Sequence, residues 1–167
     1  PYFSTWEVTI EPERGFDFEK VIKDINDLAN AEVLGRSDRV FERHRGGKIE
    51  TSSKLRIRSD EMLRDIYTPG VSRVCEAIQR DESLMRDYTG TNNSVAVVTN
   101  GPAVLGMGDI GVKGSMPVME GKAALFAELV GISSTPILVD SKDPKEVVET
   151  VVRIAASFGA IQLEDIK

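Results

Sequence analysis

Short apolar runs alternate with amphipathic stretches over residues 94–163, and this pattern constrains the fold of the chain more than any other feature. The runs are short enough to be buried strands, and the amphipathic stretches repeat apolar side chains at helical spacing. In chain order the segments are 94–99, 116–131, 135–139, 144–155 and 160–163. Strands that alternate with helices favour a layered α/β fold with mainly parallel strands. We therefore expect an α/β domain with a mainly parallel sheet and flanking helices.

A smaller α+β unit is expected ahead of this domain, over residues 1–47. Residues 5–10 alternate between apolar and polar side chains, which predicts a strand. Residues 17–29 predict an amphipathic helix, and residues 32–34 and 40–41 are expected to be extended. Such a unit is too small to bury a core by itself. Residues 48–167 then form the main domain.

Composition narrows the class of protein. The 167 residues suit one domain, or one domain with a small appendage. The net charge of −6 argues against a nucleic-acid partner, because nucleic-acid-binding domains are usually basic. No apolar run approaches the ~20 residues of a membrane span, so we expect no membrane association. A single cysteine, Cys75, excludes an internal disulfide and suits a reducing compartment such as the cytoplasm.

A glycine-rich loop follows the first strand of the main domain. Residues 103–106 are expected to form a strand that pairs with residues 94–99 across a tight turn at Asn100-Gly101. Residues 106–111 then match the pattern G-x-G-x-x-G. Gly114 and Pro117 follow it, and they are poor residues for the first turns of a dinucleotide-binding helix. We expect these glycines to let the backbone pass close to a neighbouring segment or ligand.

Three segments carry candidate chemical groups. Tyr67 precedes Pro69-Gly70, Lys122 follows Gly121, and Glu164 and Asp165 end the last predicted strand. Tyrosine is a weak acid and lysine a weak base, so together in a partly dry cleft they can exchange protons. Adjacent carboxylates supply hard oxygen ligands. These are the groups that enolise and decarboxylate a hydroxy acid, although each residue taken alone also fits an ordinary surface position.

Five motifs, in this order, resemble the N-terminal domain of bacterial-type malic enzymes over residues 48–166. They are YTPGV at 67–71, VVTNG at 97–101, VLGMGDIG at 104–111, PVMEGK at 117–122 and LEDI at 163–166. The preceding unit is similar to part of a regulatory domain of the ACT type.

The resemblance implies a reaction and roles for named residues. Malic enzymes convert L-malate to pyruvate and carbon dioxide and reduce NAD or NADP, with Mg or Mn as the metal. Tyr67 matches the general acid of the family and Lys122 its general base. Glu164 and Asp165 match two of its three metal-binding carboxylates. Asn100 stands where an aspartate is expected, which leaves its role open, and a homodimer is the expected assembly.

The resemblance also implies that the chain is incomplete. The third metal carboxylate and the dinucleotide-binding domain are expected beyond Lys167, so the chain alone is expected to be inactive. Two alternatives stay open at this point. One is a malolactic-type enzyme, which uses related motifs and releases lactate. The other is a non-catalytic regulatory or dimerisation module.

Overall fold

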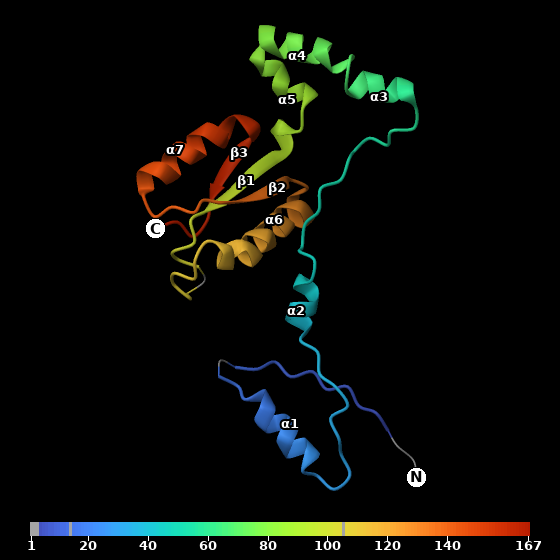
Figure 1. Cartoon of the computed structure of the whole chain (residues 1–167), viewed down its shortest axis with the longest axis vertical. Helices are drawn as coiled ribbons and strands as arrows, with labels where there is room; N and C mark the ends of the chain where they lie inside the picture. The colour runs from blue at the N-terminus through green and yellow to red at the C-terminus, as the bar shows by residue number, and fades with distance from the viewer. Residues whose placement is uncertain (1–3, 14, 105) are drawn as a thin grey trace. The chain divides into compact units, whose positions relative to one another are not determined.

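Two units make up the chain, residues 1–42 and residues 43–167. The computed structural model describes residues 4–13, 15–104 and 106–167. Figure 1 traces the backbone of both units in chain order, from blue at the N-terminus to red at the C-terminus.

The first unit contains one well-formed helix. Helix α1 spans Phe18–Asn26, and the Asp17 side chain caps it by accepting a hydrogen bond from the Lys20 N–H at 3.0 Å. The predicted helix at 17–29 is confirmed in a shorter form. The described residues of this unit contain no strand and no fully buried side chain. This unit therefore has no core in the part that the structure describes.

The strand predicted at residues 5–10 is wrong. Trp6 and Val8 are 82% and 75% exposed, and no segment of the described chain pairs with them. A strand needs a partner for its backbone N–H and C=O groups, and an alternating pattern alone does not supply one. Residues 40–41, predicted to be extended, instead lie in helix α2, Arg39–His44. The expected α+β character of the first unit is thus not observed in its described residues.

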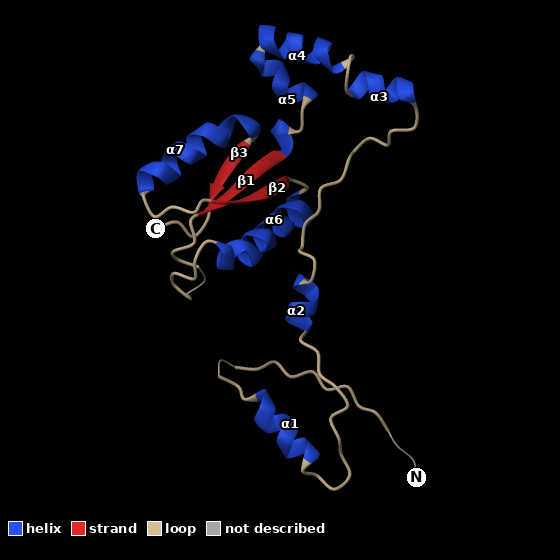
Figure 2. Cartoon of the chain, in the orientation of Figure 1, coloured by secondary structure: helices blue, strands red, loops and turns tan. Residues whose placement is uncertain are grey.

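The second unit is built on a parallel sheet, as predicted. Strands β1 (Ser94–Thr99), β2 (Ser133–Leu138) and β3 (Ala160–Leu163) pair in the order β2-β1-β3, and both pairings are parallel. Helix α6 (Met116–Val130) connects β1 to β2, and helix α7 (Pro144–Ile154) connects β2 to β3. Figure 2 shows the sheet between these two helices.

The central strand β1 is buried on both faces, so it carries most of the core. Ala96 and Val98 point to the side of α7, where they pack with Val147. Val95 and Val97 point to the opposite side, where they pack with Met119 of α6. Alternate side chains of a strand point to opposite faces, so the continuous apolar run of β1 is what a two-sided environment requires.

A helical segment precedes the sheet. Ser59 caps α3 (Asp60–Ile66), and its hydroxyl oxygen accepts a hydrogen bond from the Met62 N–H at 3.1 Å. The segment continues through α4 (Val71–Arg80) and α5 (Met85–Tyr88), with short 3₁₀ turns η1 (Glu82–Leu84) and η2 (Thr91–Asn93). Further 3₁₀ turns are η3 (Lys113–Ser115) and η4 (Ala155–Ser157).

In the described part of the chain, no helix is long and apolar enough to cross a membrane.

The strand predicted at 103–106 is also wrong, although position 105 lies outside the described residues. Both edges of β1 are occupied by β2 and β3. Val104 instead forms an isolated bridge within the loop, where its N–H donates to the Gly108 carbonyl at 3.1 Å. Gly101, with φ of +81°, turns the chain away from β1.

Candidate active site

A lysine and a carboxylate meet at the carboxyl end of the sheet. Lys122 lies in the second turn of α6, and Glu164 follows β3 directly. The Lys122 Nζ and the Glu164 Oε2 atoms are 3.3 Å apart, and their side chains are 36% and 20% exposed. Gln162 Nε2 also donates to the Glu164 Oε2 at 3.2 Å. The structure therefore brings together two of the four predicted site residues, from segments 42 positions apart (164 − 122).

Backbone pairing fixes the position of Glu164. Its N–H donates to the Val98 carbonyl at 2.9 Å, so the pairing between β1 and β3 continues one residue beyond the strand. On the other side of the contact, the loop that leaves β1 leads into α6 through η3. There the Ser115 hydroxyl is buried and donates to the Val112 carbonyl at 2.6 Å. Rigid elements thus hold both residues, as a precise site requires.

Asp165 has two features that would suit a metal-binding residue. Its φ is +51°, so the backbone turns immediately after Glu164. Its Oδ2 atom is buried and has no hydrogen-bond partner in the structure. A buried carboxylate oxygen without a partner costs about 1–3 kcal/mol or more, which a metal ion would offset. This orphan oxygen beside Glu164 fits a site for a hard divalent cation.

The described residues supply only part of such a site. Among them, no group of three or more His, Cys, Asp and Glu side chains could hold a metal ion. Mg and Mn favour six oxygen ligands and otherwise retain several waters. Glu164 and Asp165 could therefore provide two ligands, and further oxygen atoms would have to complete the shell.

Asn100 contributes a second orphan acceptor at this end of the sheet. It follows β1, and its Nδ2 donates to the Ser141 carbonyl at 3.3 Å. Its Oδ1 is buried without a hydrogen-bond partner. The sequence indicated Asn100 as a departure from the expected aspartate, and in the structure its carbonyl oxygen is an acceptor without a hydrogen-bond donor.

The glycine-rich loop is held by an ion pair that sequence reasoning missed. Lys142 Nζ lies 2.7 Å from the Asp109 Oδ2, and the Gly111 N–H donates to the other carboxylate oxygen at 3.1 Å. The hydrogen bond from Lys142 lowers the pKa of the Asp109 carboxyl below its usual value, and the same bond raises the pKa of Lys142. No sequence signal marked this pair, since its members are 33 residues apart.

Positive φ angles, rather than close approach, explain the glycines of this loop. Gly106, Gly108 and Gly111 have φ of +70°, +75° and +74°, and a Cβ at any of them would meet nothing within 4 Å. The close approach lies earlier, at Gly101, where a Cβ would come within 2.8 Å of the Val112 Cα. The expected close approach to a neighbouring segment is therefore not observed at Gly106, Gly108 or Gly111, and their approach to a ligand stays a prediction.

Lys48 is a second residue that the sequence did not single out. Its Nζ atom is buried and has no hydrogen-bond partner in the structure. Its Cε lies 3.8 Å from where a Cβ of Gly121 would be, so Lys48 packs against the turn of α6 that carries Lys122. A Gly-Gly-Lys run has no feature that distinguishes a buried amine from an exposed one, so the sequence alone did not single out Lys48.

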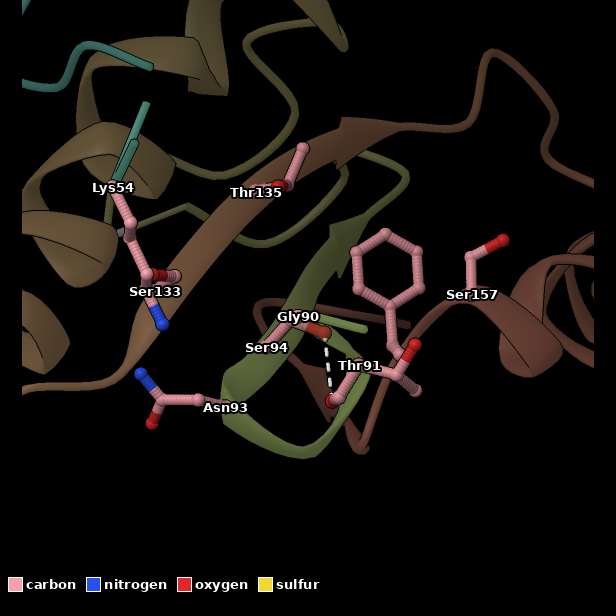
Figure 3. A pocket seen from close by; sticks show the side chains of 9 residues that line it. Lys54, Gly90, Thr91, Asn93, Ser94, Ser133, Thr135 and Ser157 are labelled. Carbon is pink, nitrogen blue, oxygen red and sulfur yellow. Dashed lines mark hydrogen bonds between the residues drawn. The ribbon is translucent and has the colours of Figure 1, made fainter. Parts of the chain in front are cut away.

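The structure does not place Tyr67 beside Lys122 and Glu164. It ends α3 and is 68% exposed, and its hydroxyl makes no hydrogen bond with the described residues. Lys54 and Asn93 lie on either side of its segment in sequence, and both line an open pocket of about 400 Å³. Figure 3 shows this pocket beside Ser94 and Ser133, the first residues of β1 and β2. The Tyr67 segment is therefore connected at the amino ends of the strands, whereas Lys122 and Glu164 lie at the carboxyl ends.

A family model and two similar proteins point to the same family. A model of the malic enzyme N-terminal domain matches residues 46–145. NAD-dependent malic enzyme 1 of Bacillus subtilis is 45% identical over 167 residues, which are 99% of this chain and 38% of that protein. NAD-dependent malic enzyme of Geobacillus stearothermophilus is 47% identical over 146 residues, 87% of this chain and 30% of that protein.

A solved structure agrees with this result. The crystal structure of NAD-dependent malic enzyme from Thermotoga maritima superposes with a TM-score of 0.74 at 41% identity. The match covers 78% of this chain and 37% of that one. The chain thus spans less than two fifths of the length of each of these three proteins.

Proposed function

The chain belongs to the malic enzyme family, and from that premise we propose that the whole protein converts L-malate to pyruvate and carbon dioxide while reducing NAD(P). The observation that carries the proposal is the 3.3 Å contact between Lys122 and Glu164, with the orphan oxygen of Asp165 beside it. A base next to hard oxygen ligands, at the carboxyl end of a parallel sheet, suits a 2-hydroxy acid substrate. The names of these two Bacillus and Geobacillus relatives favour NAD over NADP.

The residues divide the chemistry between them. Lys122 accepts the proton of the substrate C2 hydroxyl as hydride leaves for the dinucleotide. Glu164 and Asp165 would hold Mg or Mn, and such an ion would polarise the C2 oxygen and stabilise negative charge there. Tyr67 donates a proton to the carbon from which carbon dioxide has departed. Because Lys122 contacts Glu164, the proton acceptor would lie beside a metal held by Glu164 and hence near a C2 oxygen bound to that metal.

Substitution of Lys122 tests the proposal. In the whole protein, Lys122→Ala should lower malate turnover by ~10²-fold or more, since a positioned base is typically worth that much. Lys145→Ala is the matched control, because Lys145 is an exposed lysine at the start of α7. Near-normal turnover of Lys122→Ala would remove Lys122 from the mechanism. Product analysis in the same assay separates pyruvate from the lactate that a malolactic enzyme releases.

The 167-residue chain by itself should not reduce NAD or NADP with malate, even with Mn added. The G-x-G-x-x-G loop leads into α6 only through Val112 and the 3₁₀ turn η3, and its last glycine does not open the α-helix itself, so it lacks the usual phosphate-binding context. Steady-state turnover by the purified chain would contradict this and would make residues 106–111 a cofactor loop.

Three further features of the whole protein extend this proposal. We propose that residues 1–47 are part of an ACT-like regulatory unit, that the protein is a homodimer, and that it works in the cytoplasm, where its free Cys75 would stay reduced. Deleting residues 1–42 tests the first point. The shortened protein should keep its turnover and lose any response to small-molecule effectors that the whole protein shows.

A further inference from the structure

We propose that a pocket at the amino ends of β1 and β2 binds a small phosphate monoester, at a site separate from the Lys122–Glu164 group. We call it the amino-end pocket. Its lining includes one lysine, one asparagine and several hydroxyl side chains: Lys54, Asn93, Thr91, Ser94, Ser133 and Thr135. The inference goes beyond the proposed reaction, because it concerns a binding site that malate does not occupy.

The amino-end pocket and the candidate active site lie at opposite ends of β1. Ser94 opens β1 and lines the pocket, whereas the Glu164 N–H donates to the Val98 carbonyl near the other end of the strand. Strand β1 has six residues, so roughly 17 Å at ~3.3 Å per residue separates its first residue from its last. A small ligand in the pocket is therefore too far away to contact the Lys122–Glu164 group.

The charge around the pocket favours an anion. None of the described residues that line it is Asp or Glu, although the chain has 27 acidic residues against 21 basic ones. Lys54 supplies a positive charge, and Arg56 and Arg58 follow it within four positions. Among the described residues, none of these three side chains forms an ion pair. Cations that no carboxylate neutralises make the local potential positive, which attracts a negatively charged ligand.

Helix ends oppose this attraction, and a side chain covers one of them. Helices α6 and α7 both end on this side of the sheet, where their last carbonyl groups carry partial negative charge. The Asn93 Nδ2 atom donates to the Gly131 carbonyl at 3.0 Å, directly after α6. Because that carbonyl already has a donor, the Lys54 ammonium is not needed to cap it.

Hydroxyl groups on β2 give the pocket its preference for phosphate. Ser133 and Thr135 are exposed residues at alternate positions of the strand, so their side chains point to the same face. Neither hydroxyl makes a hydrogen bond with the described residues. A phosphate group has several acceptor oxygens, which suits separate hydroxyl donors around a lysine. A carboxylate is matched better by the planar fork of an arginine, and none of the described lining residues is an arginine.

Hydrogen bonds hold the walls of the pocket before a ligand arrives. The Ser53 hydroxyl donates to the Leu55 carbonyl at 2.7 Å and accepts from the Leu55 N–H at 3.1 Å, which fixes the turn that carries Lys54. The Ser94 hydroxyl donates to the Thr91 carbonyl at 3.0 Å (Figure 3). A ligand would therefore meet a site whose shape is already set, which reduces the entropy lost on binding.

The size of the pocket indicates that the phosphate carries an organic group. The volume of about 400 Å³ lies in the range of small-molecule sites and exceeds what a phosphate ion needs. Phe158 also lines the pocket and offers apolar surface to such a group. The described lining residues include no histidine or carboxylate that could activate a hydroxyl nucleophile, so we expect binding without chemistry.

Phosphorus NMR of the whole protein tests the site. Glycerol 3-phosphate is titrated while NAD is kept saturating, so that the expected dinucleotide site is occupied. The ester signal should broaden, and Lys54→Met should weaken binding about tenfold, the low end for a charge-assisted hydrogen bond. Thr135→Val should weaken binding ~3-fold, because it removes one neutral donor. Lys145→Met is the matched control on an exposed lysine of α7 and should leave binding unchanged.

The same titration contains the results that would overturn the proposal. These are no broadening, broadening that disappears when NAD is added, and equal binding by Lys54→Met and Lys145→Met. Inorganic phosphate should compete with the ester, and succinate at the same ionic strength should not. Succinate that competes as well as phosphate would show a general anion site and refute the preference for phosphate.

Hydrogen exchange of the whole protein gives a second measurement that needs no substitution. Amides in the segment around Lys54 should exchange more slowly when glycerol 3-phosphate is present, because the ligand ties this segment to β2. Unchanged exchange there, with the ester bound, would place the ester elsewhere and overturn the proposal. Neither measurement uses malate turnover, so a wrong reaction assignment would leave both results unchanged.

Discussion

At the scale of single residues, Asp165 combines two unfavourable features that only a ligand makes useful. Its backbone has a positive φ, and its Oδ2 is buried without a partner. Asp165→Asn should therefore leave the 167-residue chain as stable or more stable, because asparagine tolerates the left-handed region and carries no charge. We expect a gain of up to about 1 kcal/mol in the free energy of unfolding, measured in urea.

Glu164→Gln is the matched comparison for that experiment. It removes the contact with Lys122, which is about one-third exposed, so the expected loss is at most ~1 kcal/mol. Both variants should abolish metal-dependent turnover in the whole protein. If Asp165→Asn is the less stable of the two, the orphan oxygen has a partner in solution and the ligand assignment loses its basis.

Residues of the site could be found from the sequence, but their arrangement could not. Motifs singled out Lys122, Glu164 and Asp165, yet the contact between Lys122 and Glu164 depends on the register of β3 against β1. Register is a property of the assembled sheet, so no local pattern encodes it. Lys48 was missed for a related reason, because its burial comes from packing against α6. The catalytic and metal-binding roles stay predictions.

At the scale of elements, Gly101 is the position where the loop after β1 has least freedom. A Cβ there would meet the Val112 backbone at 2.8 Å, and φ is +81°. Gly101→Ala should destabilise the chain by more than the ~1–2 kcal/mol of a strained φ alone. Gly108→Ala is the control, with φ of +75° and open space around it. Urea unfolding should rank Gly101→Ala as clearly the worse; equal losses would mean that the backbone contact relaxes freely.

The ion pair between Asp109 and Lys142 makes the stability of the same loop depend on pH. The pKa of Asp109 is lowered from 3.8, so its stabilising contribution is present above that value and is lost as pH falls through the lower, folded-state pKa. The pKa of Lys142 is raised from 10.5, so its contribution is lost only as pH rises above that value. Lys142→Met should therefore reduce stability slightly at neutral pH and not at all below the pKa of Asp109.

The effect of added salt on stability tests whether the Asp109–Lys142 pair acts through charge. Both groups are solvent-accessible, so added salt should shrink the difference between wild type and Lys142→Met at neutral pH. A difference that persists unchanged in strong acid or in high salt would point to lost packing of the lysine stem in place of lost charge.

Elements with strong local signals were predictable. The three strands, α6, α7 and the Ser59 cap all follow from apolar spacing and capping chemistry within a few residues. The predictions at 5–10 and 103–106 failed, because a strand exists only where another segment pairs with it. Residues 5–10 find no such segment in the described chain, and β2 and β3 already occupy both edges of β1.

At the scale of the whole molecule, the proposed metal site needs more ligands than the described residues supply. Glu164 and Asp165 provide carboxylates, and the described residues hold no group of three or more potential ligands. Calorimetric titration of the 167-residue chain with Mn should therefore show weak or undetectable binding. The whole protein with malate should bind Mn far more tightly, because further protein oxygens and those of the substrate complete the shell.

Magnesium-free titrations with the Glu164→Gln variant give the control for this last experiment. Weak binding to the chain should fall further in the variant, since Glu164 is one of two carboxylates at the site. Tight, stoichiometric Mn binding by the chain, lost in Glu164→Gln, would show that the site is complete without ligands from elsewhere. Such a result would also remove the reason to expect the chain alone to be inactive for want of metal, and would leave the dinucleotide site as the missing part.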